Sequence, residues 1–301
     1  MTVINTNVAA SITANALTKN ERAMYQAMER LSTGQRINSA SDDAAGLAIS
    51  SRMTAQVNGL NMAVRNVNDG ISMIQTADGA IKEISSMLQR MRELTVQAAS
   101  LATMGSADLT ALDTEFQALD DQIDLISTST EWNGTKLLNG VLGSKNIHVG
   151  ANASQVIAIE FADFNTDNGA TEASQAQVTT LDMFSGLNND TAASGTAGTD
   201  LDGLVITGSD HDNTLAYLDR AISRVDAHRA TLGATINRLE YAADNLSNVS
   251  QNTSASRSRI LDADYAAETT ELARTQIIQQ AATAMLSQAN QQAQSVLALL
   301  K

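Results

Sequence analysis

Apolar side chains recur at intervals of three and four residues over most of the chain, which is the spacing of one face of a helix. The first 40 residues follow this spacing and predict an amphipathic helix. From residue 44 to about residue 100 the spacing continues unbroken, and a helix of that length would reach on the order of 80 Å. A helix that long indicates a rod of the coiled-coil kind rather than a globule.

The rest of the chain up to the last 40 residues predicts two further helices, β-hairpins and a loop. Residues 105–130 predict a second long helix, antiparallel to the first, and helical spacing returns at about Thr214. Between them, the Asn-Gly pair in EWNGTKLLNG and the alternation of Val156, Ile157 and Ile159 with small polar residues predict β-hairpins. Residues 141–210 carry one Lys/Arg against nine Asp/Glu and many turn formers, which predicts an exposed loop or a small appended element.

The last 40 residues mirror the first 40, with high helix propensity and apolar positions close to heptad spacing. These positions are Ile278, Ala282, Met285, Ala289, Val296 and Leu300. Residues 1–40 carry four Lys/Arg and two Glu, whereas residues 262–301 carry four Asp/Glu and two cations, which weakly favours their pairing. We therefore expect a mainly α fold: an elongated antiparallel helical bundle or coiled coil with paired N- and C-termini, a small β-hairpin region and a short variable central insertion.

The stretch LSTGQRINSASDDAAGLAIS, residues 31–50, interrupts two strongly helical regions. Gly34 is the expected C-terminal cap of the first helix. Ser41 is the expected N-cap of the next helix, with Asp42 and Asp43 in its first turn, where the helix dipole favours carboxylates. The stretch is therefore interpreted as a joint between two helices.

Composition excludes several classes of function. The chain has no Cys, so disulfides and thiol chemistry are absent. A net charge of −14 argues against a nucleic-acid surface and against an anionic membrane surface, and no run of about 18 apolar residues predicts a membrane span. The first residues lack the basic and apolar regions of a cleavable signal peptide, so secretion would need another route.

The sequence also lacks the motifs of common catalytic sites. His148, His211 and His228 lie outside any His-Glu-x-x-His arrangement, and no P-loop, dinucleotide fingerprint or nucleophile elbow occurs. The adjacent carboxylates of Asp42 and Asp43 are better explained by the start of a helix than by acid–base chemistry. We expect no enzyme activity, no metal and no cofactor.

Several long motifs resemble those of bacterial flagellin, the subunit of the flagellar filament. Those near the N-terminus are INTNVAA, RLSTGQRINSASDDAAGLAISSRM, NDGISMIQTADGAI and LQRMRELTVQAAS. Those near the C-terminus are SRILDADYAAETTELARTQIIQQAATAMLSQANQ and SVLALL, and EWNGTKLLNG also matches. Such long motifs are specific, whereas the middle of the chain, residues 165–202, resembles nothing familiar.

The resemblance implies an organisation in three parts. Residues 1–43 and 257–301 would form an inner terminal coiled coil, with spoke linkers at about 35–43 and 253–262. Residues 44–164 and 203–256 would form a rod-like helical domain with β-hairpins, and residues 165–202 a variable exposed segment.

The implied function is that of a structural subunit that self-assembles into the extracellular flagellar filament and transmits motor torque for swimming. The subunit would be exported unfolded through the channel of the filament. The implied partners are other copies of the chain, a flagellar export chaperone, cap and junction proteins, and a host Toll-like receptor of innate immunity.

The same resemblance assigns three groups of contact residues. The spoke and inter-subunit contacts are Arg36, Asn38, Ser39, Ser41, Asp42 and Asp43. The receptor or subunit contacts are Gln89, Arg90, Arg92, Glu93 and Leu94. The terminal residues for assembly and chaperone binding are Ile4, Val8, Ile278, Met285, Leu286, Val296, Leu297 and Leu300.

Three alternatives to this interpretation were considered against the sequence. A hook–filament junction protein or a minor filament protein would share similar terminal helices. A flagellin that carries a metalloprotease would need a His-Glu-x-x-His motif, which this sequence lacks. A type III translocator would need apolar segments, which are also absent.

Overall fold

The computed structural model describes residues 7–100, 105–165, 183–184 and 211–298. By their internal contacts the residues group into two compact units, which are described separately. The terminal unit comprises Met1–Asn58 and Ser250–Lys301, and the central unit comprises Gly59–Val249. The division expected from the sequence, at residues 43 and 257, stays a prediction.

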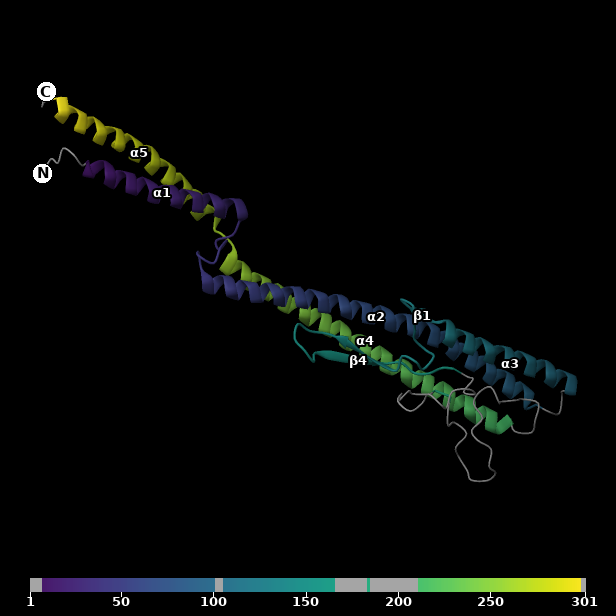
Figure 1. The fold of residues 1–301 in the computed structure, drawn as a ribbon. Coiled ribbons are helices and arrows are strands. Elements are labelled where there is room, and N and C mark those ends of the chain that lie inside the picture. The colour runs from purple at the N-terminus through teal and green to yellow at the C-terminus, as the bar shows by residue number, and fades with distance from the viewer. Residues whose placement is uncertain (1–6, 101–104, 166–182, 185–210, 299–301) are drawn as a thin grey trace. The chain divides into compact units, whose positions relative to one another are not determined.

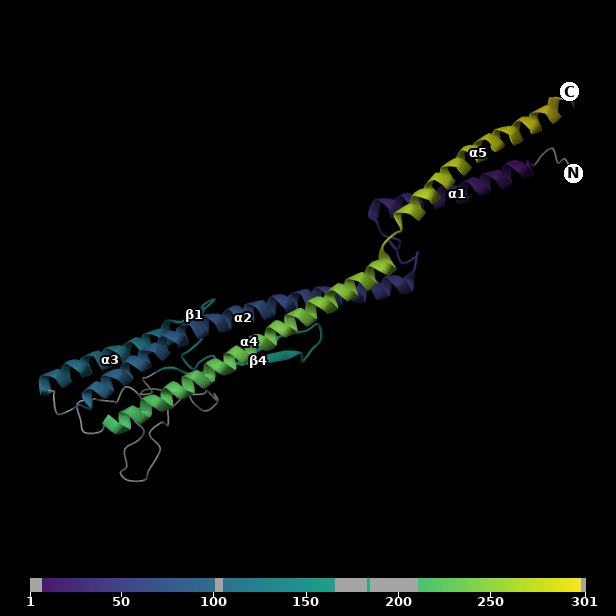
Figure 2. The same cartoon turned by 180° about the vertical axis from the view of Figure 1, so that it is seen from behind.

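In the terminal unit, the helices α1 (Val8–Thr33) and α5 (Tyr265–Ala298) lie side by side, as both views show (Figures 1 and 2). They run antiparallel, because Asn7 contacts Ala289 near one end and Arg30 contacts Glu268 near the other. The predicted pairing of the two terminal helices is confirmed.

The seam between these two helices consists mainly of small and polar residues. Its less exposed positions follow three- and four-residue spacing on each helix. On α1 they are Ala10, Thr13, Leu17, Asn20, Met24, Ala27 and Leu31. On α5 they are Glu268, Leu272, Thr275, Gln279, Ala282, Leu286 and Ala289. The heptad positions predicted at Ile278 and Met285 were wrong, since both side chains are exposed beside this seam.

Two asparagines fix the register of the pair. Asn20 donates its side-chain N–H to the carbonyl oxygen of Thr275 at 2.7 Å, and Thr275 is buried. Asn7 caps α1 by accepting the Ala10 N–H at 3.1 Å, and it donates to the carbonyl oxygen of Ala289 at 3.1 Å. A polar group buried in a helix seam has its partner in one register only, so these bonds select one alignment.

The central unit contains most of α2 (Ala44–Ala98) and α4 (His211–Leu261), together with α3 (Ser106–Ser129). The predicted long helix from residue 44 is confirmed at 55 residues, and so is the second helix after it. Its large, fully buried side chains come from all three helices and from the segments near the hairpins. They are Ile74, Ile81, Ile84, Leu88, Met91, Leu94, Phe116, Ile123, Phe161, Phe164, Phe184 and Tyr217.

The first hairpin has the turn that its sequence predicts. Strands β1 (Glu131–Trp132) and β2 (Thr135–Lys136) pair antiparallel. Asn133 has φ 49° and Gly134 has φ 75°, which is the combination that a two-residue turn of type I′ requires. The turn residues therefore determine the hairpin locally.

The second hairpin, β3 (Ser144–His148) with β4 (Val156–Glu160), packs on α2 at two glycines. A Cβ atom at Gly59 would lie 3.3 Å from Ala151 Cβ, and one at Gly70 would lie 3.2 Å from Ile147 Cγ1. Side chains at either position would push the hairpin away. The glycines thus allow close approach of a hairpin to a helix.

His228 fills part of the core of the central unit. Its ring centroid lies 5.8 Å from that of Phe164, and its buried Nε2 has no hydrogen-bond partner within the described residues. Burial lowers the pKa of His228, because the charged form would lose its hydration. In the described part of the chain, no three side chains of His, Cys, Asp or Glu gather as metal ligands would, and no helix has the length and apolarity of a membrane span.

Candidate functional site

The chain leaves α1 through a joint, residues 34–43, which pairs with residues 261–263. Gly34 has φ 69° and donates its N–H to the Arg30 carbonyl at 2.9 Å, so the predicted C-terminal cap is confirmed. Backbone hydrogen bonds then run from the Arg36 N–H to the Leu261 carbonyl at 2.7 Å and from the Ala263 N–H to the Gly34 carbonyl at 3.0 Å. The joint is therefore a paired structure rather than two free linkers.

The second connection is shorter than predicted. The linker expected at residues 253–262 was wrong, because α4 remains helical to Leu261 and α5 begins at Tyr265. Asp264 caps α5 by accepting the Ala266 and Ala267 N–H groups at 2.9 and 3.3 Å. Three residues, 262–264, complete this connection.

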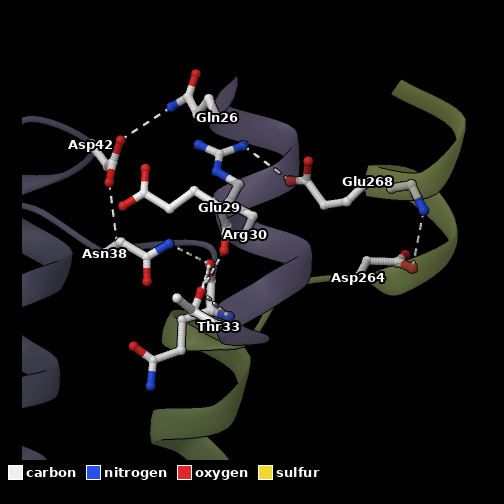
Figure 3. A network of polar contacts seen from close by, with 10 residues as sticks. Gln26, Glu29, Arg30, Thr33, Asn38, Asp42, Asp264 and Glu268 are labelled. Carbon is white, nitrogen blue, oxygen red and sulfur yellow. Dashed lines mark hydrogen bonds and ion pairs between the residues drawn. The ribbon is translucent and has the colours of Figure 1, made fainter. Parts of the chain in front are cut away.

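The carboxylate of Asp42 organises the joint (Figure 3). Its Oδ2 accepts the backbone N–H groups of Ser39 at 3.0 Å and Asn38 at 3.1 Å, and the Ser39 hydroxyl at 3.2 Å. Its Oδ1 accepts the side-chain N–H of Gln26, on α1, at 3.1 Å. These hydrogen bonds, those from the Ser39 and Asn38 backbone foremost, lower the pKa of Asp42.

The start of α2 differs from the prediction. The helix begins at Ala44, and Asp43 is its N-cap, since its Oδ1 accepts the Gly46 N–H at 2.8 Å. Ser41 is not the cap; its hydroxyl pairs with that of Ser39 at 2.7 Å. Asp42 lies before the helix because its carboxylate serves the N–H groups of the loop, which delays the helix start to residue 44.

Other side chains close the joint around Ile37, which is buried. A Cβ atom at Gly46 would lie 2.5 Å from Asp43 Oδ2 and 2.7 Å from Ile37 Cδ1, so a side chain here would force both neighbours to shift. Arg36 donates to the Ile260 carbonyl at 2.8 Å, and Arg30 pairs with Glu268 at 3.0 Å across the α1–α5 seam.

The predicted spoke residues differ in their exposure to solvent. Asn38 and Asp42 are half-buried and engaged within the joint. The side chains of Arg36, Ser39, Ser41 and Asp43 are exposed to solvent, although each also forms a hydrogen bond within the terminal unit.

The terminal helices carry large apolar side chains on their outer surfaces. Val8 and Ile12 are exposed on α1, and Ile277, Ile278 and Met285 are exposed on α5. Ile277 is 66% exposed and Met285 60%, although both are larger than most residues of the seam. An apolar surface of this kind favours contact with another protein surface.

The remaining predicted terminal residues are placed less uniformly. Leu286 is half-buried in the α1–α5 seam. Ile4 and Leu300 lie outside the described residues, and Val296 and Leu297 lie on α5 where only the backbone is described.

The polar segment near residue 90 forms ion pairs on the surface of the central unit. Arg90 pairs with Glu115 of α3 at 2.8 Å and with Glu93 at 3.0 Å, and Arg92 pairs with Asp219 of α4 at 2.6 Å. These carboxylates raise the pKa values of both arginines through hydrogen bonding and charge.

Gln89 is exposed in the same segment, but Leu94 is not. Its prediction as a surface contact was wrong, because Leu94 is fully buried and continues the apolar stripe of Leu88 and Met91 into the core. The exposed part of the segment therefore consists of polar and charged side chains.

Sequence reasoning missed three residues that shape the site: Asn20, Ile37 and Asp264. The capping role of Asp264 was accessible, because an aspartate stands directly before the helical run YAAETT. Asn20 gave no local signal, since its partner Thr275 is distant in sequence, whereas Ile37 packs near Gly46 within the same stretch of chain.

Paired terminal helices with outward apolar side chains are typical of structural subunits that associate with further copies. A family model of the bacterial flagellin N-terminal helical region matches residues 4–142, and one of the C-terminal helical region matches residues 215–300. The flagellin of Bacillus subtilis (strain 168) is 44% identical over 309 residues, with 99% of each chain covered. Flagellin B of Vibrio anguillarum is 34% identical, also with 99% of each chain covered.

The chain belongs to the bacterial flagellin family. It is a structural subunit that self-assembles into the extracellular filament of the bacterial flagellum and serves motility. The junction-protein alternative is not favoured, because the matching families and relatives are flagellins.

We expect Asp42→Asn to loosen the joint at neutral pH, because asparagine lacks the charge that strengthens the hydrogen bonds from Ser39 and Asn38. The folded state lowers the pKa of Asp42, so its stabilisation is fully present above the ordinary pKa of 3.8 and is lost as the pH falls through the lower folded value. Hydrogen exchange of the Asn38 and Ser39 amides against pH measures this.

Asp43→Asn is the matched control, since asparagine caps a helix about as well as aspartate. Its joint amides should exchange as in the natural chain. Equal exchange rates in the Asp42→Asn variant and the natural chain at neutral pH would contradict the assigned role of this carboxylate.

Proposed function

We propose that the exposed apolar side chains of α1 and α5 are the surface through which subunits meet in the inner layer of the filament. The main support is the placement of residues: Ala, Thr, Asn and Gln occupy much of the seam, while Ile277, Ile278 and Met285 point outward. Covering apolar area contributes about 25 cal/mol per Å², so each contact is small and many repeated contacts are needed. Such an interface is strong only in the assembly.

The outer surface of α5 divides into an apolar arc and a polar arc. Ile278, Ala281 and Met285 follow one another at three- and four-residue spacing, with Ile277 beside them, and form the apolar arc. The polar arc consists of Gln276, Gln280, Thr283 and Ser287, also at that spacing and also exposed. The apolar arc is the part that a neighbouring subunit would cover.

The joint would supply a second set of subunit contacts. Arg36, Ser39, Ser41 and Asp43 present polar side chains to solvent on a backbone held by cross-chain hydrogen bonds. In this proposal residues 1–43 and 257–301 act as the inner domain, residues 44–164 and 203–256 as the rod, and residues 165–202 as the variable outer segment.

The role we infer is structural alone, without catalysis. The sequence lacks the His-Glu-x-x-His motif that a metalloprotease-bearing flagellin would need. Export of the unfolded subunit through the filament channel would explain secretion without a cleavable signal peptide.

We expect Ile277→Asp to slow seeded filament growth by at least about tenfold, because an unpaired charge is costly to bury. Growth from filament seeds, followed by electron microscopy, measures the effect, and circular dichroism checks that the helices persist. Gln280→Asp places the same charge on the polar arc and should grow normally. Normal growth of the Ile277→Asp variant would refute the proposed contact surface.

The segment of Gln89, Arg90, Arg92 and Glu93 is the proposed contact for a host Toll-like receptor or for a neighbouring subunit. It presents ion-paired, exposed groups on the rigid helix α2. Leu94 supports this surface from within the core rather than touching a partner.

We expect Arg90→Asp to reduce receptor signalling or filament formation, because the new carboxylate would face Glu93 and Glu115 and reverse the local charge. A reporter-cell assay and a polymerisation assay measure the two effects. Lys82→Asp, an exposed change on the same helix, is the control. If the Arg90→Asp variant retained both activities, the assignment would fail.

The end of α5 is the proposed binding region for the flagellar export chaperone, and the terminal helices would also meet cap and junction proteins. The apolar arc of α5 lies before this end, and it offers an exposed helix face that a partner could cover before assembly. We expect removal of residues 293–301 to abolish both chaperone binding and polymerisation, as measured by co-elution and seeded growth. Chaperone binding by the shortened chain at natural affinity would contradict this.

A further inference from the structure

Met285 is the most exposed methionine among those whose side chains the structure describes. It is 60% exposed, compared with 48% for Met62 and 39% for Met28. Met73 and Met91 are buried in the core of the central unit. A soluble oxidant would therefore reach the Met285 sulfur most readily among these.

Met285 also lies on the apolar arc, where a polar side chain would weaken the proposed contact with a second copy of the chain. It continues the apolar arc of α5 after Ile278 and Ala281, on the surface proposed to be covered by a second copy of the chain. Around it on the helix, Ala281, Ala282 and Ala289 carry no donor, and Gln288 carries an exposed amide. Of these four neighbours, only the Gln288 amide could donate a hydrogen bond to a polar atom at this position once water is removed.

We propose that Met285 is an oxidation site whose sulfoxide prevents a subunit from joining the filament. The inference rests on the proposed role of the apolar arc in assembly. Hydrogen peroxide transfers one oxygen atom to the thioether: the O–O bond breaks, an S–O bond forms, water leaves, and the sulfur loses two electrons. The product is a polar, hydrogen-bond-accepting side chain of nearly the same size.

The physical effect follows from hydration. In the free subunit the sulfoxide oxygen is hydrated by water, because Met285 is 60% exposed. Assembly would cover that oxygen and remove its water, which costs free energy unless a donor replaces it. The unoxidised thioether carries no such cost. Oxidation therefore destabilises the assembled state relative to the free subunit.

The same placement of Met285 decides when it can be oxidised. Met285 is open to solvent before assembly and covered after it, so oxidation affects free subunits and spares those already in a filament. Reduction of the sulfoxide by a methionine sulfoxide reductase would restore assembly.

The test uses the full chain, treated as free subunits with hydrogen peroxide and then added to untreated seeds. Peptide mass spectrometry locates the added oxygen, and circular dichroism checks that the helices persist. We expect the oxidised chain to elongate about tenfold less efficiently, because burying an unpaired polar group costs a factor of that order. Treatment with the reductase should restore elongation.

Three variants isolate the site. Met285→Leu keeps the arc apolar and cannot form a sulfoxide, so it should elongate normally after peroxide. Met62→Leu removes the other well-exposed thioether and should remain sensitive. Met285→Gln imitates the polar product and should elongate poorly without any oxidant.

Normal elongation of chains that carry the sulfoxide at Met285 would overturn the inference, and so would equal peroxide sensitivity of the Met285→Leu variant. Equal oxidation of Met285 in free chains and intact filaments would overturn it as well. Normal growth of the Ile277→Asp variant would instead refute the covered surface itself. The two failures are therefore distinguishable.

Discussion

The antiparallel α1–α5 seam is the contact on which the terminal unit depends, and its composition limits what the pair can do alone. Small and polar residues such as Ala10, Thr13 and Gln279 line much of it, so it buries little apolar area. Asn20 nevertheless holds one register through its bond to Thr275. A pair that is well registered but weakly buried leaves its larger apolar side chains free for neighbouring subunits, which suits a component of a polymer.

The two units differ in how they obtain stability. The central unit encloses large side chains such as Phe116 and Tyr217 from separate elements, so its core is complete within one chain. The terminal unit buries mainly small groups, and the Asp42 hydrogen bonds and the paired backbone of the joint position its helices. Assembly would supply the burial that the terminal unit lacks, and oxidation at Met285 would interfere at that step.

The two units also differ in net charge. The terminal unit, Met1–Asn58 with Ser250–Lys301, carries nine Lys/Arg and eight Asp/Glu. The central unit, Gly59–Val249, carries ten Lys/Arg and 25 Asp/Glu. The terminal helices of neighbouring copies can therefore pack without a large net repulsion. The central unit keeps the strong negative charge that opposes indiscriminate association.

The sequence by itself determined the features whose cause is local. Helical periodicity placed α2 and α3, the Asn133-Gly134 pair determined the first hairpin turn, and Gly34 ended α1. Only the tertiary structure decided which side of α5 faces its partner, because a three- and four-residue pattern of mostly small residues allows more than one face and the partner helix selects between them. It also decided that Asp43 rather than Ser41 caps α2, since the Asp42 carboxylate is held by groups from the joint and from α1. Burial of Leu94, by contrast, is recorded in the local pattern, because Leu88, Met91 and Leu94 follow one another at three-residue spacing on α2 and all three are buried.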